Sequence, residues 1–107
     1  MFENRRTISN SSTNPLDVLF EPMCTDHSLA PGEQLTVVGR SPHEGQLEVI
    51  ETSDGVAVYS WPGSTLQVFN GDKLVYDFNF PVPDLPPDMS TRSFVEFMFG
   101  GLGGPNR

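Results

Sequence analysis

The alternation of apolar and polar side chains is clearest between Val56 and Phe80. Residues 74–80 place Leu, Tyr, Phe and Phe at every second position, which is the period of a strand with one solvated face. Residues 56–61 and 65–69 are β-branched and aromatic, and the turns 62–63 and 70–72 separate the three runs. The pattern predicts a three-stranded β-meander.

The same pattern recurs in shorter form earlier in the chain. Alternating runs predict strands over residues 16–20, 34–38 and 46–51. The turn 30–33 contains Pro and Gly, and 53–55 indicates a hairpin, whereas 23–28 is predicted to be a loop.

Short strands separated by frequent turns predict a mainly β fold. We expect a single antiparallel β-sandwich or small barrel of about six to seven strands, formed by residues 15–80. The motif Pro31-Gly32-x-x-Leu35-x-Val37 recurs from Pro62, which is typical either of two related halves or of any strand entered through a Pro-Gly turn.

The two ends of the chain lack this pattern. Residues 1–14 are predicted to form a polar arm, with a short edge strand over Thr7 to Ser9 at most. Residues 81–107 begin with a proline-rich strap (81–87) that we expect to run extended over the surface. We expect Ser90 to Phe99 to form either a short helix or a strand with apolar side chains on both faces. A Gly-rich tail follows.

Composition narrows the function classes. A chain of 107 residues fits one domain, and its single cysteine cannot form an internal disulfide. The N-terminal region has no apolar run typical of a signal peptide, and no run is long enough for a membrane helix, so we expect a cytoplasmic protein without membrane association. A net charge of -8 without a basic stripe argues against nucleic-acid binding.

Candidate catalytic and metal chemistry is sparse. Cys24 and His27, spaced as Cys-x-x-His, form the densest group of metal-ligating side chains, but a structural zinc site needs four ligands. A Cys24 nucleophile lacks an evident orienting group, and the paired carboxylates have no spacing that places them in one site. We therefore predict a protein without enzymatic activity and without a cofactor.

Two aromatic residues form the candidate ligand site. Tyr59 and Trp61 fall on the same side of a straight strand, where exposed rings would stack on a sugar and buried rings would belong to the core.

The C-terminal segment is the candidate partner-binding surface. Phe94, Phe97 and Met98 belong to an apolar arc that is wide for one short helix to bury on a small domain. We expect this segment to dock on its own domain, on a second copy or on another protein. Truncation after Asp88 is predicted to lower stability or oligomeric order.

Two motifs give the chain a family resemblance. Glu21-Pro22 followed by Leu29-x-Pro31-Gly32, and later Val58-Tyr59-x-Trp61-Pro62-Gly63-Ser64, resembles a group of small uncharacterised bacterial proteins with a Glu-Pro-Trp-Gly, Leu-x-Pro-Gly and Trp-Pro-Gly pattern. The sequence departs from it with Met23 and Cys24 in place of Trp and Gly, and with Ser60 in place of Gly. The resemblance implies a small bacterial β-domain and assigns no activity.

The sequence thus favours a small protein-interaction or assembly module whose partner is either a second copy of the chain, giving a homo-oligomer, or another protein. A small-ligand or carbohydrate-binding β-sandwich is the alternative. A second alternative is an acidic inhibitor or immunity-type protein whose charged face covers a basic site.

Overall fold

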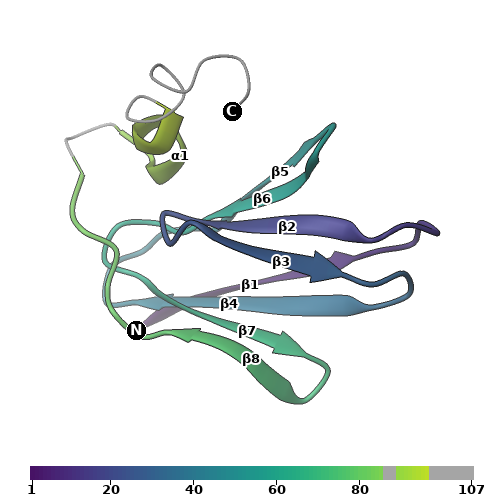
Figure 1. Ribbon diagram of the computed structural model, residues 1–107. Coiled ribbons are helices and arrows are strands. Elements are labelled where there is room, and N and C mark those ends of the chain that lie inside the picture. Colours follow the sequence, from purple (N-terminus) through teal and green to yellow (C-terminus); the bar gives the residue numbers. More distant parts are fainter. Residues whose placement is uncertain (86–88, 97–107) are drawn as a thin grey trace.

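The computed structural model describes residues 1–85 and 89–96, which form eight strands and one short helix (Figure 1). The strands are β1 (Phe2–Ser9), β2 (Leu16–Glu21), β3 (Thr25–Leu29), β4 (Gln34–Ser41), β5 (Glu48–Thr52), β6 (Gly55–Tyr59), β7 (Thr65–Asn70) and β8 (Lys73–Phe78), and the helix is α1 (Thr91–Val95).

The strands form two four-stranded sheets. One has the order β1-β4-β7-β8 and is antiparallel throughout. The other has the order β3-β2-β6-β5, and its central pair, β2 and β6, runs parallel. Side chains from both sheets meet in one core cluster, comprising Ile8, Val18, Phe20, Leu29, Leu35, Val37, Leu47, Val58, Trp61, Leu66 and Val68. Period-2 alternation places the strand residues of this cluster on the facing sides of the sheets, while Leu47 and Trp61 lie just before β5 and just after β6.

The mainly β prediction is confirmed, but its details need correction. The structure has eight strands rather than six or seven, and they do not close into a barrel in the described part of the chain. The expected wholly antiparallel sandwich is wrong because β2 and β6 are parallel neighbours.

One observed strand was not predicted, and another is longer than predicted. Residues 25–29, within the predicted loop, form β3 and pair with β2 from Leu16 to Phe20. The first strand covers Phe2–Ser9 instead of Thr7 to Ser9 and pairs with β4 over its whole length. Both strands lie at sheet edges, where polar side chains are tolerated and the apolar pattern is weak.

The repeated Pro-Gly motif marks two similar turns. Gly32 and Gly63 both have φ of +83°, a conformation that glycine adopts without strain. The strands that follow, β4 and β7, are antiparallel neighbours in one sheet. The echo therefore belongs to a shared way of entering a strand, and the two copies do not face each other from opposite sheets.

After β8 the chain crosses to the other sheet. Val82 is buried, and its N–H and C=O bond to Ser64 O and Gly63 N at 2.9 and 2.8 Å. Helix α1 begins after Ser90, whose Oγ accepts from Ser93 N at 3.0 Å and so caps the helix. Val95 packs on Ala57 and Tyr59, on the outer face of the second sheet.

Candidate functional site

The most regular open edge of the molecule is β1. Within the described residues β1 pairs with β4 alone, and the register runs without interruption from Phe2↔Ser41 to Ser9↔Gln34. The other edge strands are shorter, with five residues in β3, five in β5 and six in β8, and the β7–β8 register is shifted at Val68/Phe69. A long, regular edge presents unpaired backbone donors and acceptors to an incoming strand.

Charged side chains occupy the outer face of β1. Arg40 Nε lies 3.0 Å from Glu3 Oε1, and Arg5 Nη2 lies 3.3 Å from Glu3 Oε2. The hydrogen bond from Arg40 lowers the pKa of the Glu3 carboxyl, so this side chain is ionised over a wider pH range than usual. The edge therefore carries fixed charges of both signs on a protein whose net charge is -8.

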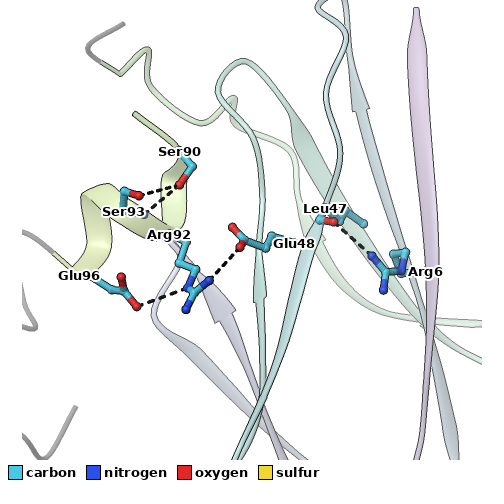
Figure 2. Close-up of polar contacts among 7 residues, drawn as sticks. All are labelled: Arg6, Leu47, Glu48, Ser90, Arg92, Ser93 and Glu96. Atoms are coloured by element: carbon cyan, nitrogen blue, oxygen red, sulfur yellow. Dashed lines mark hydrogen bonds and ion pairs between the residues drawn. The ribbon is translucent and has the colours of Figure 1, made fainter. Parts of the chain in front are cut away.

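The inner face of β1 is anchored to the loop before β5. The Leu47 N–H donates to Asn4 Oδ1 at 2.9 Å, and Arg6 Nη1 donates to Leu47 O at 3.3 Å. Figure 2 shows Arg6 reaching from β1 to that carbonyl. These two contacts and the backbone hydrogen bonds to β4 hold β1 in an extended conformation without a bound partner.

A groove of about 420 Å³ adjoins this edge, between β1 on one sheet and β5–β6 on the other. Its apolar lining comprises Ile8, Leu16, Val49 and Val56. Arg6, Glu51, Thr52, Gly55 and residues 7 and 9–12 complete its lining. The opposite side of the molecule is closed by aromatic contacts, because Tyr76 of β8 stacks with Phe78 and bonds to His27 of β3 at 3.0 Å.

A smaller hollow of about 270 Å³ is lined by β1, β4 and the β7–β8 region. Its lining residues are Arg5, Thr36, Arg40, Phe69, Gly71 and Asp72. Arg40 is already engaged by Glu3 and by Gln67, whose Oε1 lies 2.7 Å from Arg40 Nη1. The hollow therefore has less uncommitted positive charge than its two arginines suggest.

Tyr59 and Trp61 do not form an exposed pair. Their exposed fractions are 8% and 7%, and they belong to separate clusters, Tyr59 beneath α1 and Trp61 between the sheets. The Trp61 indole N–H donates to His43 O at 3.0 Å. An aromatic stacking platform needs two accessible rings on one face, and the end of β6 at Tyr59 breaks the straight run that this prediction assumed.

The predicted partner-binding residues are only partly described. Phe94 is half-buried on α1, while Phe97 and Met98 lie outside the described residues. Helix α1 is tied to the second sheet by Arg92, whose guanidinium lies 3.1 Å from Glu48 and 3.4 Å from Glu96 (Figure 2). The Glu48 hydrogen bond raises the pKa of Arg92. The part of the segment that is described thus docks on its own domain.

Cys24 and His27 have different surroundings. Cys24 is exposed in the β2–β3 turn with φ of +53°. His27 pairs with Val18, a core residue, and its Nδ1 is engaged by the Tyr76 hydroxyl. Across residues 1–85 and 89–96, no group of three or more His, Cys, Asp or Glu side chains is arranged to hold a metal ion. The predicted two-residue metal site gains no third ligand of this kind there.

The sequence predicted at most three residues of this edge, Thr7 to Ser9, and did not predict the groove. The inner positions of β1 include Asn4 and Arg6 between Phe2 and Ile8, so apolar alternation is hidden. The groove combines residues 6–16 with residues 49–56, and only the sheet order brings these two segments together. The available signal was the length of residues 2–9 without proline or glycine.

In the described part of the chain, no helix has the length and apolar character required to cross a membrane. Comparison of the chain with protein-family models, with curated proteins and with solved structures finds no match.

Proposed function

We propose that this protein is a small non-enzymatic interaction module that recruits an extended partner strand to the open edge β1. The observation that carries the proposal is the uninterrupted eight-residue register of β1 on one side, with no second strand on its other side among the described residues. Strand addition obtains affinity from backbone hydrogen bonds and selectivity from side chains at alternate positions.

Two features support the proposal that β1 binds a partner strand and is not an edge protected against pairing. Natural edges are commonly blunted by short length, bulges or proline, and β1 has eight residues, a continuous register and no proline. The Leu47 contacts also fix β1 in place, which lowers the ordering cost of association. The edge carries charged side chains of alternating sign. A partner strand therefore needs charges of opposite sign at the facing positions.

The test uses two neighbouring proline variants, Arg5→Pro and Arg6→Pro, which remove one positive charge each. Backbone N–H groups alternate sides in an antiparallel strand, so one of the two positions donates to β4 and the other donates outward. We expect the variant with the higher melting temperature to be the outward one, and to lose partner strands while staying folded. The variant at the position that donates to β4 should have the lower melting temperature, because it loses a hydrogen bond of the β1–β4 ladder.

Native mass spectrometry of the protein purified from its own source provides the readout. The wild type should retain a protein partner or a second copy, and the outward proline variant should release it. Retention of every bound chain by that variant would contradict the proposal.

The groove supports a second candidate function, binding of a small apolar or amphipathic ligand. Its volume lies within the range of about 300–1,000 Å³ typical of ligand pockets, and its apolar lining leads toward the core. A monomer that carries a small molecule in the same mass spectrum, and loses it in Val49→Phe, would favour this function over strand recruitment. The acidic inhibitor alternative remains a prediction, for which strong salt dependence of partner binding is the expected sign.

A further inference from the structure

The side chains of β1 alternate between two faces, and this limits how any strand can pair there. Asn4 and Arg6 contact Leu47, and Ile8 lies in the core, so even-numbered positions face the second sheet. Glu3 is the register partner of Arg40 and bonds to it, and Arg5 bonds to Glu3, so odd-numbered positions face outward.

We infer that the strand recruited by β1 is β1 of a second copy, paired antiparallel about a two-fold axis at Asn4. This inference rests on the proposed function and names its partner. In a two-fold dimer that continues the sheet, outward residues oppose outward residues, so the numbers of opposed residues sum to an even number.

Charge selects one register among those centred on residues 3–6. Centring the axis on Glu3, Arg5 or Arg6 places that residue directly opposite its own like-charged copy, which is unfavourable. Centring it on Asn4 places Glu3 opposite Arg5 of the second copy, and the symmetry repeats this pair. The β1 sequence Phe2-Glu-Asn-Arg-Arg-Thr7 is therefore self-complementary in this register.

The same register accounts for two further features of the edge. Phe2 is a large apolar side chain with 46% of its surface exposed, and it lies opposite Arg6 of the second copy, which can cover the ring. Arg40 holds Glu3 from the β4 side at 3.0 Å, so Glu3 stands between Arg40 and the incoming Arg5. The outer face then continues as a row of alternating charges across the dimer.

Two opposite charge reversals test both the partner and the register. In Glu3→Arg, residues 3 and 5 are both positive, and in Arg5→Glu they are both negative. Each variant alone should dimerise at least about tenfold more weakly than the wild type, because two attractive pairs become repulsive. An equimolar mixture should form a heterodimer, since both of its cross-strand pairs are again opposite in charge.

The matched controls are Asp77→Arg and Lys73→Glu on edge strand β8, which make the same changes in net charge away from β1. Both should dimerise like the wild type. Circular dichroism melts report folding, and native mass spectrometry identifies the heterodimer because the two reversal variants differ in mass.

The inference is overturned if the wild type stays monomeric at millimolar concentration, or if mixing the two reversal variants yields no heterodimer. A monomeric wild type that still binds another protein, and releases it in the outward proline variant, would leave the proposed function standing. If the outward proline variant keeps both its own dimer and every other partner, both proposals fail.

Discussion

At the residue scale, Trp61 shows how glycine makes room for a core side chain. A Cβ built on Gly39 would lie 2.6 Å from Trp61 Cζ3, and one built on Gly45 would overlap the five-membered part of the indole. These glycines are required by close approach and not by backbone conformation, because neither has a positive φ. The ring is thereby held where its N–H reaches His43 O.

We expect Gly45→Ala to lower the free energy of unfolding by about 1–3 kcal/mol, since an added methyl group in a packed site forces side chains to move. Trp61 emission in the wild type should be blue-shifted and resistant to quenchers, and it should shift to the red in the variant. Gly32→Ala is the control, because its cost comes from φ of +83° with no atom within 4 Å of the added Cβ. Unchanged stability and emission in Gly45→Ala would contradict this packing.

At the element scale, α1 is short and owes its place to packing. A five-residue helix has little intrinsic stability in water. Ser90 caps it, Arg92 ties it to Glu48, and Val95 is fully buried against Ala57 and Tyr59.

Val95→Ala should therefore cost about 2 kcal/mol, the order expected for removing two buried methyl groups with incomplete collapse of the site. Phe94→Ala, at a half-buried position on the same helix, should cost less. Denaturant unfolding monitored by circular dichroism measures both changes. Equal losses in the two variants would mean that α1 is not seated through Val95. Truncation after Asp88 removes Val95, and the loss of its contacts with Ala57 and Tyr59 is the physical reason to expect lower stability in the truncated protein.

Strand prediction from sequence succeeded where one face of the strand is buried. β4 and β7 have buried apolar positions and were expected near their observed bounds. β8 was also expected near its observed bounds, although only Tyr76 and Phe78 pack against the core and Leu74 is exposed. It failed for β3, where His27 occupies an inward position as a partner of Tyr76, and polar residues disguise the period. The parallel contact of β2 with β6 joins segments distant in sequence, and no local pattern records it.

The candidate site was harder to predict than the fold. Burial of Tyr59 and Trp61 depends on α1 and on the loop that holds His43, which come from other parts of the chain. The β1 edge depends on no second strand lying beside it among residues 1–85 and 89–96, and a sequence pattern shows which residues can pair but not which remain unpaired.

At the scale of the whole molecule, two copies with a charge of -8 repel each other over long distances. Dimerisation through β1 needs local attraction that exceeds this repulsion, and the Glu3 and Arg5 pairs supply it. Glu3 can do so only as a carboxylate, so its contribution depends on pH.

The pKa of Glu3 is lowered by its hydrogen bond from Arg40, and a facing Arg5 in the dimer lowers it further. If a carboxyl group has a lower pKa in the dimer than in the monomer, its ionised form stabilises the dimer. This stabilisation is present at higher pH and is lost as the pH falls through the pKa that the group has in the dimer. We expect the wild type to dimerise more tightly than Glu3→Gln at pH 7, and the difference to vanish below the pH range in which an ordinary glutamate titrates. Sedimentation equilibrium of both proteins across this range measures the difference. Comparing the two proteins cancels most of the effect of the other carboxylates, whose protonation alters the long-range repulsion equally. A difference that persists at acid pH would show that shape or the neutral hydrogen bond, and not the charge of Glu3, sets the register.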